Sequence, residues 1–184
     1  LADFKVSALD FCVSGCGTGV SVSWVARALR SERPDCKIVL SEPHNAPLIG
    51  SGVPQERFAD GSPTGSHPAW EPHVIQGWTP DFIPKVLQEG IDQSFFDEVR
   101  PVDGVKGMGM AQHLAANEGI LTGVSGGSTL LTAVEVANEA PEGSALLVML
   151  PDTGERYLST PLFESIPAEM SEEEAALFTS TRET

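Results

Sequence analysis

LDFCVSGCGTGVS, residues 9–21, decides the fold class of this chain. Leu9 to Val13 has the composition of a short buried strand, and Val20 to Arg30 has the apolar spacing of a helix. Between them lies a glycine loop, Ser14 to Gly19. The stretch therefore predicts a strand that passes through a tight loop directly into a helix.

The rest of the chain repeats this alternation. Further strands are predicted at residues 37–40, 96–102, 121–124 and 145–150, and further helices at residues 84–89, 105–118 and 129–139. Alternating strands and helices are typical of a parallel sheet covered by helices. We therefore expect an α/β fold with a parallel β-sheet flanked by helices in three αβα layers.

Two segments stand outside the alternation. Residues 43–81 are rich in Pro, Gly, Ser and His, and loops of this length are usually functional or disordered. The aromatic residues Trp70, Trp78 and Phe82 are expected to anchor that loop. Ser171 precedes three glutamates, which predicts a terminal helix. We expect one domain over residues 1–163, including the long loop, and a tail with a short helix over residues 164–184.

Composition excludes several classes of protein. The chain of 184 residues carries a formal net charge of −15, which argues against binding to nucleic acid or to an acidic membrane surface. No stretch approaches the ~20 apolar residues that cross a bilayer. The three cysteines form no paired framework or metal-ligand pattern, so we expect a reducing, cytoplasmic (or plastid-type) location and no metal. The absence of an initiator methionine suggests a piece of a longer protein.

The first glycine loop predicts an anion site. Glycines let backbone amides approach a ligand, and the helix that follows adds unpaired N–H groups and a partial positive charge. Thr18 and Ser21 add hydroxyl donors. A tight turn without a ligand is the plain alternative, but the pattern favours a phosphate.

One phosphate ligand to consider is a dinucleotide. Gly15 and Gly17 follow a strand, and Glu42 follows the next strand, where an acid that binds ribose belongs. Val20 occupies the position of the third fingerprint glycine, however, and the long loop interrupts the expected repeat. An NAD-type domain is therefore the weaker alternative.

A second junction lies at Gly123 to Ser128. There Ser125 is placed to cap the next helix, and its hydroxyl could also pair with the ring nitrogen of a heteroaromatic cofactor. A third polar turn, Pro151 to Thr160, follows the last strand. Ligands gather at the carboxyl ends of parallel strands, so these three turns predict one site.

These motifs resemble a known family. Residues 17–21, Gly-Thr-Gly-Val-Ser, are similar to the Gly-Thr-Gly-Gly-Thr phosphate loop of fold-type II pyridoxal-phosphate enzymes, specifically the cysteine synthase (O-acetylserine sulfhydrylase) family. Residues 73–77 resemble its His-Lys-Ile-Gln-Gly segment, and Pro151 to Thr160 matches its Pro-Asp-Thr-Gly-Glu-Arg-Tyr-Leu-Ser-Thr run without a change. The resemblance extends from Leu9 to Phe163 and implies the C-terminal part of the large domain.

The resemblance implies roles for individual residues. Gly77 and Pro80 would contact the substrate, and Ser125 would pair with the pyridine nitrogen of pyridoxal phosphate. The cofactor site as a whole would comprise Gly17, Thr18, Gly19, Val20, Ser21, Ser125, Pro151 and Asp152. Val20 departs from the family glycine and requires a negative φ there. Trp78 and Pro80 depart from the family's Gly-Ile-Gly-Ala-Gly-Phe and would alter the pocket.

The reaction that the resemblance implies is β-replacement on O-acetylserine by sulfide to give L-cysteine. The family's Schiff-base lysine is missing, because Lys5, Lys37, Lys85 and Lys106 all lack its context. The missing lysine implies that the N-terminal half of the same enzyme is a partner. The resemblance implies two more partners, a second copy in a homodimer and serine acetyltransferase. A non-catalytic family member that binds the serine acetyltransferase tail is the alternative.

Overall fold

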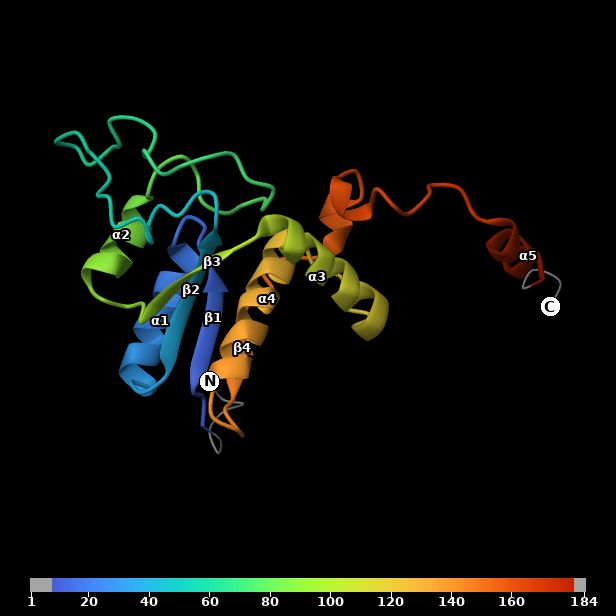
Figure 1. The fold of residues 1–184 in the computed structure, drawn as a ribbon, viewed down its shortest axis with the longest axis horizontal. Coiled ribbons are helices and arrows are strands. Elements are labelled where there is room, and N and C mark those ends of the chain that lie inside the picture. Colours follow the sequence, from blue (N-terminus) through green and yellow to red (C-terminus); the bar gives the residue numbers. More distant parts are fainter. Residues whose placement is uncertain (1–7, 181–184) are drawn as a thin grey trace.

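The computed structural model describes residues 8–180, and its centre is a four-stranded parallel sheet (Figure 1). The strands are β1 (Phe11–Gly15), β2 (Lys37–Pro43), β3 (Glu98–Val102) and β4 (Leu146–Val148), in the order β3-β2-β1-β4. In register, Phe11 of β1 lies opposite Lys37 of β2 and Leu146 of β4. The predicted parallel sheet is confirmed.

Helices cover both faces of the sheet. The helices of residues 8–180 are α1 (Val20–Glu32), α2 (Lys85–Asp92), α3 (Gly104–Glu118), α4 (Val124–Glu139) and α5 (Glu172–Ser180), with short 3-10 helices η2 (Gly154–Tyr157) and η3 (Pro161–Phe163). Of these, α1 and α4 pack directly on the sheet. Cys12 of β1 packs with Ala26 of α1, whereas the next residue, Val13, packs with Ala133 of α4. Because neighbouring side chains of a strand point to opposite faces, α1 and α4 lie on opposite sides of the sheet, which gives the expected three layers.

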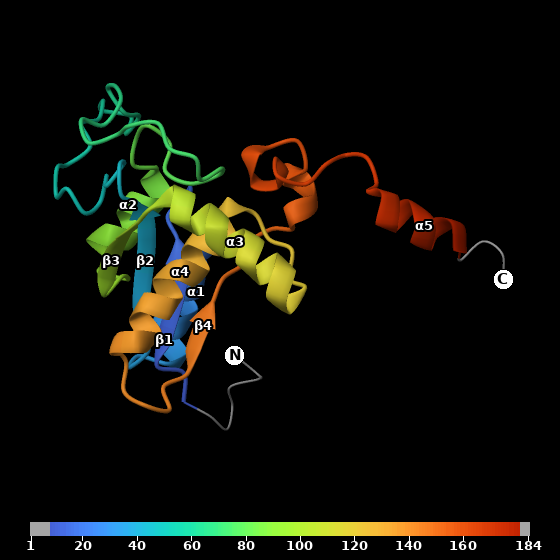
Figure 2. The same cartoon turned by 45° about the vertical axis from the view of Figure 1, so that its right-hand side comes forward.

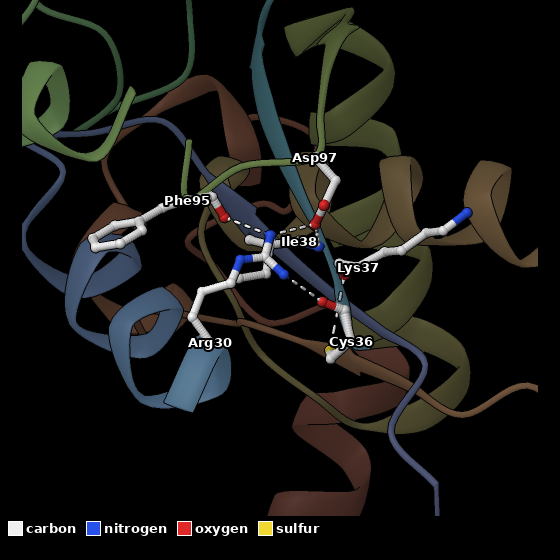
Figure 3. A network of polar contacts seen from close by, with 6 residues as sticks. All are labelled: Arg30, Cys36, Lys37, Ile38, Phe95 and Asp97. Carbon is white, nitrogen blue, oxygen red and sulfur yellow. Dashed lines mark hydrogen bonds and ion pairs between the residues drawn. The ribbon is translucent and has the colours of Figure 1, made fainter. Parts of the chain in front are cut away.

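Arg30 fastens α1 to the sheet (Figure 3). Its guanidinium donates to the carbonyl oxygens of Cys36 at 2.9 Å and Phe95 at 2.8 Å, and pairs with the Asp97 carboxylate at 2.5 Å. Asp97 also accepts a hydrogen bond from the amide of Ile38 at 2.6 Å. One side chain thus joins the end of α1 to the starts of β2 and β3.

The sequence prediction was wrong between residues 121 and 128. No strand forms at 121–124, and the predicted loop at 125–128 is the first part of α4, whose N-cap is Gly123 rather than Ser125. The reason is close packing against α3. A Cβ on Gly127 would lie 2.2 Å from the carbonyl oxygen of Gly107, so the glycines bring two helices together.

The remaining elements lie close to their predicted positions. The last strand is shorter than residues 145–150, and α2 extends to Asp92. Gly119 caps α3 at φ 69°, as predicted. The tail helix α5 begins just after Ser171, whose hydroxyl accepts from the amide of Glu174 at 3.2 Å, and it stands away from the rest of the molecule (Figure 2). Within the described part of the chain, no helix is long and apolar enough to span a bilayer.

Candidate functional site

A cavity of about 370 Å³ opens at the carboxyl end of β1, beside the N-termini of α1 and α4. This volume lies within the usual range for small-molecule sites. It is lined by residues of four segments that are far apart in the sequence: Ser14, Gly15, Gly17, Thr18, Gly19, Val20, Ser21 and Val22; Gln76, Gly77 and Trp78; Ser125; and Met149, Pro151, Asp152 and Tyr157. The three turns that were predicted to form one site are therefore brought together.

The first glycine loop leads into the N-terminus of α1. Its N-cap, Gly19, has φ 88°, and a Cβ there would lie 2.6 Å from the Cα of Leu87. Val20 avoids a positive φ, as its side chain requires, because the left-handed residue is the glycine before it. No side chain among residues 8–180 caps the helix and its first turn holds no acid, so the amides and the helix dipole are left for an anion.

Ser125 is a second polar residue that lines the cavity. It lies in the first turn of α4 and is 3% exposed. The backbone carbonyl of Ser125 accepts a hydrogen bond from the Thr129 hydroxyl at 2.9 Å. The residue that carries the Ser125 hydroxyl is part of the cavity wall. The N-cap amide of this helix, at Gly123, donates to the Asp152 carboxylate at 3.1 Å. The start of α4 and the turn at Asp152 are thus joined at the cavity wall.

Thr79 ties the long loop to the glycine loop. Its amide and its hydroxyl both donate to the carbonyl oxygen of Cys16, at 2.8 Å and 3.1 Å. Its own carbonyl oxygen accepts from Trp70 Nε1 at 3.2 Å and lies 3.0 Å from His73 Nε2. Thr79 has φ 30°, which is uncommon for a residue other than glycine, so these contacts hold a strained turn in place.

Trp78 forms part of the cavity wall and packs against the last residue of β1. A Cβ on Gly15 would lie 2.0 Å from the indole ring, so the ring rests directly on the Gly15 backbone. The indole is 8% exposed and also packs with Ile75, Val102 and Val124. The expectation that Trp78 anchors the loop is confirmed.

Comparison with known proteins finds a matching family and related enzymes. The family described as pyridoxal-phosphate dependent enzyme matches residues 1–152. The chain is 42% identical to O-ureido-L-serine synthase of Streptomyces lavendulae over 90% of this chain and 45% of that protein. It is 34% identical to a cysteine synthase of Staphylococcus aureus over 89% of this chain and 46% of that one.

Solved structures of related enzymes are also similar to this chain. A crystal structure of O-ureido-L-serine synthase has a TM-score of 0.77 at 40% identity, covering 96% of this chain and 49% of that chain. A cysteine synthase from Entamoeba histolytica has a TM-score of 0.69 at 29% identity, covering 90% and 43%. The chain belongs to the pyridoxal-phosphate dependent enzyme family. It spans about half the length of the curated relatives that it matches.

The residues of the cavity fit the cofactor of this family, pyridoxal phosphate. The fit rests on the glycine cradle, because a Cβ on Gly17 would lie 2.9 Å from the carbonyl oxygen of Gly77 and would narrow the space between the two segments. The uncapped end of α1 suits a phosphate dianion, and Ser125 supplies a neutral hydroxyl for a ring nitrogen. One cavity therefore offers partners for both ends of the cofactor.

The structure corrects the role considered for Glu42. The carboxylate is buried and accepts hydrogen bonds from the amides of Ile49 at 3.0 Å and Gly50 at 2.8 Å. Burial raises the pKa of this carboxyl, and the two amide bonds oppose that rise. Glu42 fastens the start of the long loop and does not line the cavity, so the arrangement expected of a dinucleotide site is absent here.

The predicted substrate residue Pro80 and the described lysines do not belong to the cavity wall. Pro80 lies outside the cavity lining, in a small apolar hollow with Cys16 and Leu87. Among residues 8–180 no lysine lines the cavity, since Lys37 begins β2, Lys85 begins α2 and Lys106 lies in α3; Lys5 falls outside the described residues. Nor does that part of the chain hold a cluster of metal-ligating side chains.

Sequence reasoning missed the contacts of Tyr157. Its hydroxyl donates to the Asp152 carboxylate, and its ring lines the cavity. Tyr157 stood inside the motif Pro151 to Thr160, which was recognised only as a resemblance. The signal available was the polar turn itself, and nothing in the spacing showed which side chains of that turn would face one another.

Proposed function

We propose that this chain is the cofactor-phosphate-binding part of an enzyme that performs β-replacement on an activated L-serine. The observation that supports the proposal most strongly is the single cavity that joins the uncapped amides after Gly17 to the Ser125 hydroxyl. The comparisons support β-replacement as the chemistry of the family to which the relatives belong. The chain spans about half of those relatives, so the activity belongs to the complete protein.

The cavity residues that would contact the cofactor have proposed tasks. The amides at Gly17 to Ser21, with the hydroxyls of Thr18 and Ser21, bind the phosphate group. Ser125 pairs with the pyridine nitrogen and Pro151 lies beside the ring. When bound, pyridoxal phosphate withdraws electrons from the α-carbon of the amino acid attached to it. A neutral hydroxyl at the nitrogen limits that withdrawal, which suits β-replacement.

Gly77 and Trp78 are proposed to shape the substrate side of the cavity. Gly77 has φ 80° and nothing lies within 4 Å of the position that a Cβ would take, so the backbone is open to a ligand. Trp78 presents a broad ring at the cavity wall in place of the smaller family residue. Because Pro80 does not line the cavity, its part is indirect, in fixing the turn at Thr79.

Two products fit the relatives, L-cysteine and O-ureido-L-serine. The 42% identity to O-ureido-L-serine synthase exceeds the 34% identity to cysteine synthase, which favours O-ureido-L-serine. The altered wall at Trp78 also favours a nucleophile other than sulfide. Mass spectrometry of the product, with the complete protein offered sulfide and N-hydroxyurea in competition, distinguishes the two.

The proposal is tested first on cofactor binding by the chain itself. Pyridoxal phosphate is expected to raise the melting temperature and NAD is not, because only a ligand of the folded state stabilises it. Ser125→Ala is expected to weaken pyridoxal-phosphate binding roughly 3- to 10-fold, the loss of one hydrogen bond. Phosphorus NMR of the cofactor in a titration with the chain measures both affinities.

The matched control is Ser128→Ala, one turn further along α4. The Ser128 hydroxyl is buried, does not line the cavity and makes no hydrogen bond with any residue that the structure describes. Its loss is expected to leave cofactor affinity unchanged. Equal losses in both variants, or stabilisation by NAD alone, would contradict the proposal.

We also propose that a second polypeptide segment supplies the lysine amine, consistent with the partial coverage of the relatives. Association into a homodimer, cytoplasmic location and binding of serine acetyltransferase remain predictions of the sequence. Gel filtration of the complete protein, alone and with a serine acetyltransferase tail peptide, tests the two associations.

A further inference from the structure

We propose that Tyr157 is a positioning residue that holds the Asp152 carboxylate away from the pyridine nitrogen of the cofactor, so that this nitrogen meets only the Ser125 hydroxyl. The inference rests on the proposed function and adds to it the control of the cofactor's protonation. Asp152, Tyr157 and Ser125 all line the same cavity. The ring nitrogen therefore has two candidate partners of different charge within one wall.

Both oxygens of the Asp152 carboxylate are occupied. Oδ1 accepts from the Gly123 amide at 3.1 Å, and Oδ2 accepts from the Tyr157 hydroxyl. The backbone carbonyl of Asp152 is also fixed, because it accepts from the Thr122 hydroxyl at 3.3 Å. The carboxylate is therefore held by donors on two sides.

The packing leaves the carboxylate little freedom. A Cβ on Gly123 would lie 2.4 Å from Cε2 of Tyr157 and 2.9 Å from Oδ1 of Asp152, so ring, carboxylate and helix start are in close contact. The negative charge also lies at the positive end of α4, which stabilises it there. The carboxylate has two hydrogen-bond donors, the Gly123 amide and the Tyr157 hydroxyl, and only the hydroxyl can be removed by a side-chain substitution.

The surroundings of Tyr157 keep its hydroxyl protonated, so that it remains a hydrogen-bond donor to Asp152. The hydrogen bond to Asp152, followed by burial, raises the pKa of Tyr157 to about 12, and the neighbouring Arg156 acts in the opposite direction. The first turn of α4 contributes no acidic side chain. The phenol therefore stays protonated at neutral pH and continues to bind the carboxylate.

The consequence is chemical. A carboxylate beside the pyridine nitrogen favours the protonated, positively charged ring, since an opposite charge nearby raises the pKa of a base. A serine hydroxyl donates to the nitrogen or accepts from it without adding charge. By holding the Asp152 carboxylate at the start of α4, Tyr157 keeps this negative charge away from the pyridine nitrogen. The unprotonated, neutral ring is then favoured.

The test measures the ring nitrogen directly. Pyridoxal phosphate labelled with ¹⁵N in the ring is bound to the 184-residue chain, and its nitrogen resonance is followed from mildly acidic to mildly alkaline pH. The wild-type chain is expected to hold an unprotonated nitrogen. Tyr157→Phe is expected to raise the apparent pKa of the nitrogen by about 1 to 3 units, and the double variant Tyr157→Phe with Asp152→Asn is expected to return it to the wild-type value.

Three results would overturn the inference. They are an unprotonated nitrogen in Tyr157→Phe, a double variant that behaves like Tyr157→Phe, and a protonated nitrogen in the wild type that Asp152→Asn deprotonates. The third measurement can overturn the inference even if Tyr157→Phe does not fold. Phosphorus NMR on the same samples separates the two proposals, because an unbound phosphate in the wild type would end the proposed function itself.

Discussion

Gly19→Ala should separate two requirements at the N-cap of α1, a left-handed backbone and close packing against α2. Gly19 has φ 88°, and a Cβ there would lie 2.6 Å from the Cα and 2.7 Å from the amide nitrogen of Leu87. The contact is with the backbone of α2, so no side-chain rotation relieves it. Gly143 is the matched control, because it has φ 85° and nothing lies within 4 Å of its Cβ position.

The magnitudes follow from these two environments. A left-handed conformation costs an L-residue about 1 to 2 kcal/mol, and Gly143→Ala should lose that amount. Gly19→Ala carries the same cost and adds overpacking of about 1 to 3 kcal/mol, for a total of about 2 to 5 kcal/mol. The gain from a stiffer unfolded chain is common to both variants and cancels in the comparison.

Urea unfolding followed by circular dichroism measures both free energies of unfolding. Unchanged m-values would show that the difference lies in the native state. A Gly19→Ala variant no less stable than Gly143→Ala would refute the reasoning, because it would mean that α2 does not press on the loop. Pyridoxal-phosphate affinity should fall in Gly19→Ala and stay constant in Gly143→Ala.

Two further predictions concern the framework of the fold. Arg30→Ala should lower the free energy of unfolding by roughly 2 to 4 kcal/mol, since it removes two carbonyl contacts and a partly exposed ion pair. Arg27→Ala, which within the described part of the chain loses contacts to two aromatic rings, should cost less than about 1 kcal/mol in the same urea titration. All three thiols should resist Ellman's reagent in the native chain and react in urea, because all are buried free cysteines. Burial raises the pKa of Cys12 and Cys16 from 9.0 to about 12, so the unfolded chain releases protons that the folded chain retains, and stability should fall as pH rises from 9 toward 12. Rapid native labelling, or stability that is constant over that pH interval, would count against this account.

The sequence predicted the fold where local pattern and packing agree. The apolar run at Leu9 and the helical spacing after Val20 placed β1 and α1 within a few residues. Gly119 and Ser171 marked the helix ends at which the structure has them. At these positions a residue's own conformational preference is also the one that its environment requires.

The prediction was wrong where distant packing decides the conformation. Gly126 and Gly127 suggested a loop, yet both lie in α4, because their missing side chains make room for Thr122 and for Gly107 of α3. Glu42 stood where a ribose-binding acid belongs, yet the amides of the long loop take its carboxylate. Neither partner is visible in a local window, since both depend on how far-apart segments meet.

The sheet ends at β4, a strand of three apolar residues, Leu146, Leu147 and Val148, all half-buried. Within the described residues β4 pairs only with β1, so its outer edge offers backbone donors and acceptors to any strand that approaches. During production in a host cell, this edge is expected to drive self-association and inclusion bodies. Anyone purifying the chain should therefore expect better yields when a polypeptide that supplies a neighbouring strand is made in the same cell.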